Sequence, residues 1–378
     1  MWALRLTAGP IVKLIMAYRC KREKGPDTPT IVISNHNTNL DPALVTLGFF
    51  GYLYFVASEH AFRKGFRSKL LTFVFNPIPI NKAQGDSFAL KEMIRRLKGG
   101  YNICLFAEGN RSFNGVTWPI ALATAKLVKI SGAALVTYRL EGAYFTSPRW
   151  GKKMRRGKTT GRVTGRYTPE EIKSMTAEDV LGAIERGIYE DAYQRQGETP
   201  VRYRGKDLAE HIETVLYMCP ECKKIGTIHS KGNRFSCSCG FNGVYAETGF
   251  LEGENLPFST ITEWDKWQKE QLELAVNNAG DEVICGDDNQ RLFMVHAASE
   301  NSFVGEGPML ISRREFHCAG SIFPLQQIKQ FAIVGKMTLL FALKDGTQYE
   351  VLSVFPRSAL KYLEILNILR TDNGLFSG

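Results

Sequence analysis

The sequence predicts an α/β domain whose sheet is covered by helices on both faces, then a small cysteine-bearing segment, and finally a β-rich C-terminal module with a closing helix. Three observations lead to this prediction. Short apolar runs alternate with amphipathic stretches between residues 30 and 138, four of the eight cysteines fall between residues 219 and 239, and strand-like runs predominate after residue 281. With 378 residues and 44% hydrophobic content, the chain is long enough for two or three folded domains.

Strands and helices alternate along the first domain. Short apolar runs predict strands at 30–34, 52–57, 102–107 and 133–138. Helical spacing of apolar residues predicts helices at 42–50, 86–98 and 119–130, and helical spacing resumes over 169–196. We expect the helix over 86–98 to end at the glycine pair that follows it and to turn four apolar side chains inward, namely Phe88, Leu90, Ile94 and Leu97.

Basic residues gather in two stretches. Residues 1–24 carry six Lys or Arg residues and a single acid, with apolar residues at helical spacing at Ile11, Leu14, Ile15 and Tyr18. This pattern fits a helix that lies in a membrane headgroup layer and equally a helix packed on the core. Residues 149–166 hold eight Lys or Arg residues, four glycines and no acid, which predicts a mobile surface loop. Such a loop meets anionic headgroups, is simply solvated or, as the least favoured of the three, meets nucleic acid.

The last third of the chain is predicted to be mostly β. A helix over 262–278 has Thr262 and Asp265 at capping-box spacing and Gly280 at its end. Strand-like runs follow at 292–296, 309–312, 338–343 and 349–354, with Asp345 and Gly346 as a hairpin turn. A final helix over 358–369 presents one apolar side, formed by Tyr362, Leu363, Leu366 and Leu369. Strands closed by a helix are similar to a pleckstrin-homology-like module.

Charge and cysteine usage indicate where the protein works. The formal net charge of +10 favours an anionic partner such as a membrane surface, and we expect no specific nucleic-acid partner. Cysteine pairs together with isolated thiols suit a reducing compartment. The first eighteen residues lack the unbroken apolar stretch of a secretory signal, and the charge-free run 42–58 is shorter than the ~20 residues of a spanning helix. We therefore expect a cytoplasmic protein, peripheral or monotopic on the cytosolic membrane face.

The clustered cysteines form two closely spaced pairs. Two residues separate Cys219 from Cys222, one residue separates Cys237 from Cys239, and fourteen residues lie between the pairs. Two thiolate pairs on facing turns make a closed tetrahedral site, and a closed site is typical of structural zinc. Gly240 permits a tight turn after the second pair. The spacing therefore predicts a zinc ribbon with these four cysteines as ligands, rather than four free thiols.

A polar loop follows directly on the first predicted strand and contains His36 and Asp41. Loops at the carboxyl end of a strand are where α/β domains place their sites. Asp41 precedes Pro42, so it either caps the next helix or, if the loop folds back, binds one imidazole nitrogen of His36. In the second arrangement the other nitrogen can take a proton from a hydroxyl group.

The third predicted strand also ends in a polar turn, which contains Glu108, Gly109 and Arg111. Gly109 lets the backbone approach a ligand, and the planar guanidinium of Arg111 suits a phosphate group. The alternative is a turn with a solvated Glu108–Arg111 pair.

Together the two blocks resemble the 1-acylglycerol-3-phosphate acyltransferase family, the glycerolipid acyltransferases with a His-x4-Asp signature. The first block reads Asn-His-x-x-x-x-Asp-Pro from 35 to 42, and the second, over 106–112, resembles the family's Phe-Pro-Glu-Gly-Thr-Arg-Ser. Their order and separation agree with the family as well. Lys82 stands where the family usually has an arginine at the end of a strand, and 134–142 matches its fourth block loosely.

This sequence departs from the family pattern at four positions. Ala107 and Asn110 replace the usual Pro and Thr, Thr137 stands where proline is expected, and Lys82 replaces arginine. A lysine is a point charge without the arginine fork, so it holds phosphate with less geometric control. The departures leave the acyl-transfer centre intact and bear on the identity of the acceptor.

The resemblance implies transfer of a fatty acyl group from acyl-CoA or an acyl-carrier-protein to the hydroxyl of a lysophospholipid. His36 would be the general base and Asp41 would orient it, while the glycerol phosphate would be positioned by Lys82, Glu108, Gly109 and Arg111. Two alternatives stay open, namely the same chemistry on another lysolipid and a non-catalytic lipid-binding zinc-ribbon protein. We expect an interfacial helix over 1–24, the acyltransferase domain over 25–205, the zinc ribbon over 206–247 and the β-rich module over 248–378.

Overall fold

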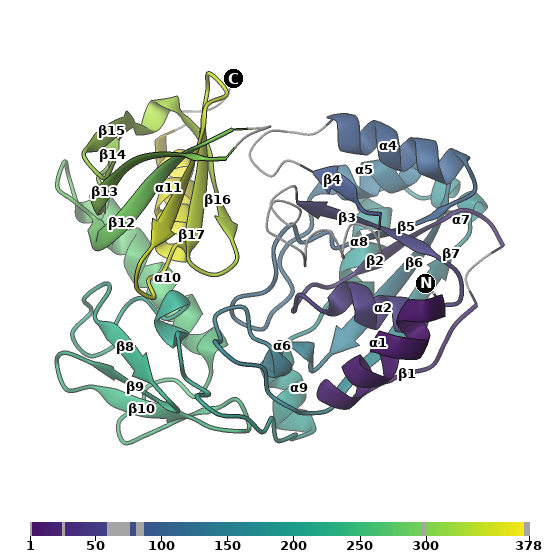
Figure 1. Ribbon diagram of the computed structural model, residues 1–378, viewed down its shortest axis with the longest axis horizontal. Helices are drawn as coiled ribbons and strands as arrows, with labels where there is room; N and C mark the ends of the chain where they lie inside the picture. The colour runs from purple at the N-terminus through teal and green to yellow at the C-terminus, as the bar shows by residue number, and fades with distance from the viewer. Residues whose placement is uncertain (1, 25–26, 59–75, 81–86, 297–299, 374–378) are drawn as a thin grey trace. The chain divides into compact units, whose positions relative to one another are not determined.

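The computed structural model describes residues 2–24, 27–58, 76–80, 87–296 and 300–373, and its elements are labelled in Figure 1. The chain divides into two compact units. The first comprises residues 1–149, 154–205 and 247–249, and the second comprises 150–153, 206–246 and 250–378. The cysteine-bearing segment and the β-rich module thus belong to one unit.

The first unit is built on a seven-stranded sheet with the order β1-β7-β6-β2-β5-β3-β4. Neighbouring strands run parallel, except that β7 is antiparallel to β6. The strands are β1 (Tyr18–Cys20), β2 (Thr30–Ser34), β3 (Leu53–Ser58), β4 (Ile78–Ile80), β5 (Asn102–Leu105), β6 (Ala134–Glu141) and β7 (Thr159–Tyr167). The central strand β2 has the predicted bounds and is buried along its whole length.

Helices cover both faces of this sheet. Ile31 and Ile33 of β2 belong to one core with α4 (Ser87–Lys98), α5 (Leu122–Ser131) and α8 (Ala177–Ile188), whereas Val32 belongs to a second core with α2 (Asp41–Gly48). Successive side chains of a strand point to opposite faces, so an unbroken apolar run is buried only when both faces are covered. The predicted fold class is confirmed.

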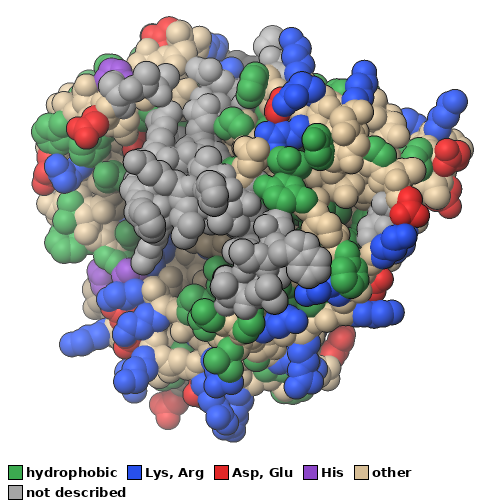
Figure 2. Space-filling model, turned by 45° about the vertical axis from the view of Figure 1, so that its right-hand side comes forward, with side chains coloured by type: hydrophobic (Ala, Val, Ile, Leu, Met, Phe, Trp, Pro, Cys, Tyr) green, Lys and Arg blue, Asp and Glu red, His purple; other side chains and the backbone are tan. Residues whose placement is uncertain are grey.

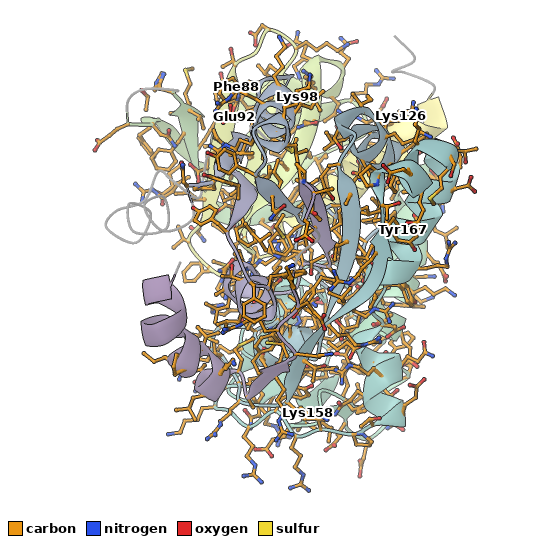
Figure 3. The ribbon with its side chains drawn as sticks, turned by 90° about the vertical axis from the view of Figure 1, so that its right-hand side faces the viewer. Phe88, Glu92, Lys98, Lys126, Lys158 and Tyr167 are labelled. Carbon is orange, nitrogen blue, oxygen red and sulfur yellow. The ribbon has the colours of Figure 1, made fainter. Side chains whose placement is uncertain are left out.

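The predicted basic surface loop is largely wrong. Lys and Arg side chains are spread over the viewed face of the molecule (Figure 2), but the second half of the run 149–166 forms strand β7. Figure 3 marks its course, with Lys158 just before the strand and Tyr167 at its end. Gly161 is needed there because a Cβ at this position would lie 2.5 Å from the Tyr138 hydroxyl on the neighbouring strand. The glycines that suggested mobility therefore allow close packing.

The N-terminal helix is shorter than its apolar spacing predicts. Helix α1 spans Trp2–Ile15, and Tyr18 lies instead in β1, where its hydroxyl bonds the Tyr138 hydroxyl at 2.8 Å. On the part of α1 whose side chains are described, Ile11, Leu14 and Ile15 are exposed. Tyr18, the last residue of the predicted apolar stripe, thus belongs to the sheet, and the other three residues of the stripe are exposed.

Helix α4 buries only part of the predicted face, with Leu97 buried and Ile94 partly buried against the core as expected. Its buried side chains are Ala89, Met93 and Leu97, spaced four residues apart, whereas Phe88 and Leu90 are exposed. Figure 3 labels Phe88 together with Glu92 and Lys98 along this helix. The buried face therefore does not include Phe88 and Leu90. The small Ala89 lies on it, and a small residue permits close approach to the sheet.

The second unit contains a four-stranded sheet and a seven-stranded antiparallel sheet, with the orders β11-β10-β9-β8 and β15-β14-β13-β12-β18-β17-β16. The first has β8 (Ile228–Lys231), β9 (Arg234–Cys237), β10 (Asn242–Tyr245) and β11 (Leu251–Glu252). The second has β12 (Cys285–Val295), β13 (Ser302–Ile311), β14 (Glu315–Cys318), β15 (Ser321–Pro324), β16 (Ile328–Val334), β17 (Thr338–Leu343) and β18 (Gln348–Ser353). The β-rich module is confirmed, and its likeness to a pleckstrin-homology-like module stays a prediction.

Two helices complete the second unit. Helix α10 (Ile261–Asn278) is capped by Thr260 with Glu263, so the predicted box at Thr262 and Asp265 is two residues too late. Asp265 is buried and instead pairs with Lys269 at 2.6 Å. The closing helix α11 (Leu360–Asn373) buries one apolar side that includes Tyr362, Leu366 and Leu369, with Leu363 half-buried. Among the described residues, no helix has the length and apolar content to cross a membrane.

Candidate functional site

The His36 loop folds back on itself, as one of the two sequence interpretations requires, so that Asp41 turns toward the ring of His36. Helix α2 begins at Asp41, and the N-cap position belongs to Leu40, which makes no side-chain cap. The Asp41 carboxylate instead accepts a hydrogen bond from His36 Nδ1 at 2.8 Å. The interpretation of Asp41 as a helix cap is therefore wrong.

Asp41 also holds the loop backbone. Its Oδ2 accepts the amide hydrogens of Asn37 at 2.6 Å and Thr38 at 2.8 Å, and its Oδ1 accepts the Thr38 hydroxyl at 2.7 Å. Asp41 is fully buried, whereas the His36 side chain is 22% exposed. A carboxylate bound to Nδ1 places the Nδ1 proton and leaves Nε2 as the nitrogen that can accept a proton from a substrate hydroxyl.

The second sequence block lies against the first. The Glu108 carboxylate accepts the His36 amide hydrogen at 2.6 Å and the Trp118 amide hydrogen at 2.7 Å. The Ser112 amide in turn donates to the His36 carbonyl at 2.9 Å, and the Phe106 ring stacks on the His36 ring with centroids 4.3 Å apart. Both the amide and the carbonyl of His36 are thus bound by the block that the sequence placed 72 residues later.

Burial dominates the electrostatics of this block. It raises the pKa of Glu108 to about 8, although the two backbone amides oppose the rise by stabilising the carboxylate. Burial lowers the pKa of Arg111, against the attraction of Asp41. Gly109 has a φ of +67°, the left-handed conformation that favours glycine. The turn that contains Glu108, Gly109 and Arg111 thus lies beside the loop of His36 and Asp41. Lys82 lies outside the described residues.

A second arginine, Arg149, joins Arg111. Its Nη1 donates to the Arg111 carbonyl at 3.1 Å, and its guanidinium lies 4.0 Å from the centroid of the Phe113 ring. Arg149 is only 4% exposed, and its pKa is lowered first by burial and then by the charge of Arg111. In the sequence Arg149 begins the basic run 149–166, whose composition predicts a mobile surface loop, and no local motif distinguishes it from its neighbours.

A buried carboxylate, Glu190, is another residue of the candidate site that sequence reasoning missed. It lies between α8 and α9 (Ala192–Glu198), and its side chain reaches Asn35 and Asn37 on either side of His36. Burial raises its pKa to about 7, opposed by Arg195. Glu190 and its neighbour Asp191 between two helices form no recognisable motif, so only the tertiary structure reveals this contact.

The four clustered cysteines meet in the second unit. Their sulfur atoms all lie within 4.8 Å of one another, with 3.7 Å between Cys219 and Cys239 and the same distance between Cys222 and Cys237. Gly240, with a φ of +99°, makes the turn after the second pair as expected. This group could hold one metal ion.

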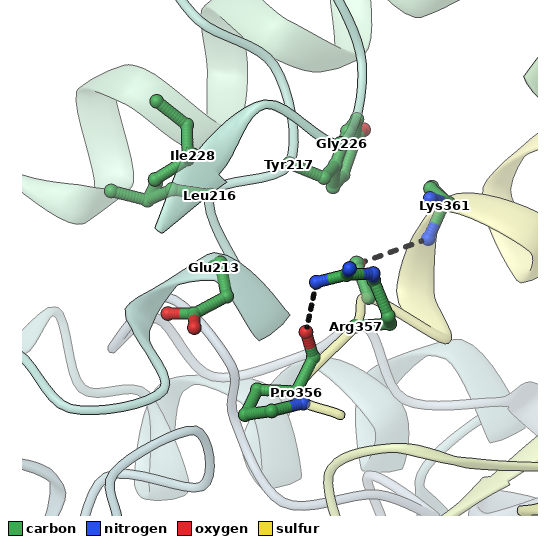
Figure 4. Close-up of a pocket in the computed structure, with 9 residues that line it drawn as sticks. Glu213, Leu216, Tyr217, Gly226, Ile228, Pro356, Arg357 and Lys361 are labelled. Atoms are coloured by element: carbon green, nitrogen blue, oxygen red, sulfur yellow. Dashed lines mark hydrogen bonds between the residues drawn. The ribbon is translucent and has the colours of Figure 1, made fainter. Parts of the chain in front are cut away.

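A small pocket in the second unit holds none of the predicted site residues (Figure 4). Arg357 and Lys361 line it, but both cations are paired with the buried Asp287, at 3.6 and 2.8 Å. The two cations that line this pocket are therefore paired within the fold. The candidate reaction centre is instead the His36 loop of the first unit.

Of the comparisons with known proteins, the family match covers this location. No curated protein matches the chain. Among solved structures, the 1-acyl-sn-glycerophosphate (LPA) acyltransferase PlsC from Thermotoga maritima is similar, with a TM-score of 0.42 and 20% identity over 54% of this chain and 83% of that chain. Residues 18–140 match the family model described as Acyltransferase. This match runs from β1 to β6 and includes both sequence blocks, so the resemblance is confirmed for this part of the chain: residues 18–140 match the Acyltransferase family model.

Proposed function

We propose that the protein transfers a fatty acyl group from acyl-CoA or an acylated carrier protein to the free hydroxyl of 1-acylglycerol-3-phosphate. The observation that carries this proposal is the 2.8 Å bond between His36 Nδ1 and the fully buried Asp41 carboxylate, in a region that matches the Acyltransferase family model. A buried carboxylate on Nδ1 makes Nε2 basic and stabilises the imidazolium that forms.

The proposed reaction is a direct attack. His36 Nε2 takes the proton of the acceptor hydroxyl, and the hydroxyl oxygen attacks the thioester carbonyl carbon. The carbon–sulfur bond then breaks, and the departing thiolate takes the proton from the His36 imidazolium. Asp41 keeps its carboxylate on Nδ1 throughout and stabilises the charged ring. No atom of the protein needs to carry the acyl group.

An anionic acceptor fits the arginine pair. The Arg149 guanidinium bonds the Arg111 carbonyl and its pKa is lowered by the charge of Arg111, while the nearby Asp41 is already engaged with His36. A phosphate group would offset the repulsion between these cations and accept charge-assisted hydrogen bonds. We propose that Lys82 adds a third cation, and that Glu108 acts by holding the loop, since both its oxygens accept backbone amides.

The test is acyl transfer from a long-chain acyl-CoA to a panel of lysolipids in detergent. We expect lysophosphatidate to be the preferred acceptor, and His36→Ala to lower kcat by at least ~100-fold with an unchanged fold, because a general base contributes about that much. His317→Ala is a matched control, since His317 also pairs with a carboxylate at 2.8 Å but lies on β14 of the other unit. Preference for a lysolipid without a free phosphate would favour the alternative acceptor. If the protein transferred no acyl group from acyl-CoA or from carrier-protein thioesters, the proposal that it is an acyltransferase would be refuted.

We further propose that the enzyme is monotopic on the cytosolic face of an anionic membrane. Ile11, Leu14 and Ile15 are exposed on α1, Phe50 is exposed after the end of α2, and the guanidinium of Arg22 lies 5.1 Å from the Phe50 ring centroid. Apolar side chains next to cations suit an interfacial site. Leu14→Glu should lower binding to vesicles with anionic lipid in a sedimentation assay, and equal binding by both forms would refute this placement.

We propose zinc as the metal of the cysteine group. A tetrahedral site with zinc–sulfur distances of about 2.3 Å has sulfur–sulfur edges of about 3.8 Å, close to the 3.7 Å of the two measured pairs. Four sulfur ligands close the coordination shell, so the ion would stabilise the ribbon over 206–247 and take no part in acyl transfer. The β-rich module over 248–378 would likewise serve placement or stability.

A further inference from the structure

Glu190 is anchored at a fixed place beside the sheet. Its amide donates to the Thr117 hydroxyl at 2.9 Å, and its carbonyl accepts the Thr117 amide hydrogen at 3.0 Å. The residue is 5% exposed. The backbone of Glu190 is therefore held by Thr117, and its carboxylate points at a defined group of donors.

One carboxylate oxygen of Glu190 holds both neighbours of His36. Oε2 accepts Nδ2 hydrogens from Asn35 at 3.3 Å and from Asn37 at 3.1 Å. Asn35 is also bound twice to the Leu140 backbone, once as donor and once as acceptor, at 2.8 Å each. The loop is thereby fastened to β6 at the residue before His36.

The other oxygen ties Glu190 to the end of β6. Oε1 accepts the Gly142 amide hydrogen at 2.8 Å and the Arg195 Nε hydrogen at 3.2 Å. Gly142 has a φ of +77°, and a Cβ there would lie 2.5 Å from the Lys158 carbonyl oxygen, so the position requires glycine. These four partners of the carboxylate are all N–H donors, which suits the ionised form.

We propose that Glu190 is a positioning residue for the acyl transfer: it holds Asn35 and Asn37 so that the ring of His36 meets Asp41 in the reactive orientation. The inference rests on the proposed function. Its physical basis is that three consecutive loop residues are bound by buried carboxylates, two by Glu190 and the His36 amide by Glu108. Glu190 lies fifty residues beyond the matched family region. A later segment of the chain therefore contributes a residue to the proposed reaction centre.

Glu190→Gln separates this role from a general contribution to folding. The substitution keeps the shape of the side chain but turns one oxygen into an amino group that faces N–H donors. We expect kcat to fall roughly 10–100-fold, since a shift of about 1 Å in a reacting group costs that much, with KM for the thioester changed less than about threefold. The melting temperature also falls, because buried donors lose acceptors.

A double-mutant cycle with His36→Ala gives the decisive comparison. If Glu190 acts through His36, Glu190→Gln adds no further loss to the residual rate of His36→Ala, while it lowers the melting temperature by the same amount in both backgrounds. An equal fold-loss of rate in both backgrounds refutes the positioning role, as does wild-type kcat in Glu190→Gln.

A reciprocal variant and a matched control complete the design. When Glu190→Gln is combined with Asn37→Asp, the new carboxylate at position 37 accepts from the amide nitrogen introduced at position 190, and we expect kcat to recover at least about tenfold. Gln196→Glu is the control, because Gln196 is fully buried in the same unit and its side chain bonds the Val201 backbone. It should lower the melting temperature and leave kcat unchanged, and a comparable loss of kcat would mean that the effect is one of stability.

A spectroscopic readout keeps the inference testable apart from activity. The proton between His36 Nδ1 and Asp41 should give a low-field proton resonance that Asp41→Ala abolishes. We expect Glu190→Gln to shift or broaden this resonance, whereas Gln196→Glu leaves it in place, and an unchanged resonance in Glu190→Gln refutes the inference. Loss of the proposed function would appear separately, as a wild-type protein that transfers no acyl group.

Discussion

Asp41→Asn isolates the charge of the carboxylate from the shape of the loop. Oδ2 of Asp41 accepts three hydrogen bonds, whereas Oδ1 accepts one from the Thr38 hydroxyl, which can turn and accept instead. An asparagine can therefore place its oxygen at the Oδ2 position and its amino group toward Thr38. The ring of His36 keeps its partner and its tautomer, and only the negative charge is lost.

The size of the effect follows from the difference between charged and neutral hydrogen bonds. A bond to a charged group contributes about 1.5–3 kcal/mol and a neutral bond about 0.5–1.5 kcal/mol, so the His36 imidazolium loses roughly 1–1.5 kcal/mol of stabilisation when the carboxylate becomes an amide. At about 1.36 kcal/mol per factor of ten, kcat should fall roughly 5–15-fold. KM should change little, because the charge of the ring develops in the transition state.

Asp41→Ala should behave differently. It leaves the buried amides of Asn37 and Thr38 without their acceptor, at a cost of about 1–3 kcal/mol each, so both kcat and the melting temperature fall. The assay is steady-state acyl transfer from acyl-CoA to lysophosphatidate, read together with thermal unfolding of each variant. Wild-type kcat in a folded Asp41→Asn protein would refute the reasoning, because the buried charge would then have no part in the reaction.

Three further predictions concern the metal, the pH dependence of stability and the acceptor. A strong chelator should release about one zinc ion per chain and lower the melting temperature while kcat at low temperature is retained; release of no zinc would contradict the cysteine site. Burial raises the pKa of Glu108 from 4.5 to about 8 and that of Glu190 from 4.5 to about 7. Between these pH values the two carboxyl groups keep protons in the folded chain that they have already lost in the unfolded chain. Unfolding free energy should therefore fall as pH rises from about 4.5 to 8, and an identical slope in the Glu108→Gln, Glu190→Gln double variant would count against this. Arg149→Leu should raise KM for lysophosphatidate roughly 10–100-fold, but not KM for a lysolipid without a free phosphate, with the exposed Arg162→Leu as control; equal changes for both acceptors would show that Arg149 does not meet the phosphate.

The parts of the first unit that the sequence predicted well are those with local signals. The apolar run of β2 is buried on both faces of a parallel sheet, so it needs no alternation to be recognised. His36 and Glu108 could be predicted as neighbours because each follows a strand of that sheet and parallel strands end at the same edge. The bond between His36 and Asp41 needed more than spacing, since Asp41 fits a helix cap equally well.

Two wrong predictions in the first unit have a common physical cause, namely packing between neighbouring strands of the sheet. The composition of β7 suggested mobility, yet Gly161 is there to make room for Tyr138 of the adjacent strand. Tyr18 continues a helical stripe in the sequence but lies at the sheet edge, where its hydroxyl bonds both Tyr138 and the Leu44 carbonyl. The contact between Tyr18 and Tyr138 joins residues more than a hundred positions apart, and local spacing carries no information about it.

The proposed reaction centre extends beyond the matched region of the chain. The matched region stops at Leu140, but the loop around His36 also depends on Glu190, and Arg149 lies against the second block. The first unit reaches further still, because the Tyr203 amide donates to the Glu247 carbonyl at 2.7 Å and residues 247–249 belong to this unit. A segment after the cysteine group thus returns to the first unit. The chain cannot be cut at residue 205 without removing a part of the unit that holds His36, and the intact protein is the form in which the catalytic roles are best measured.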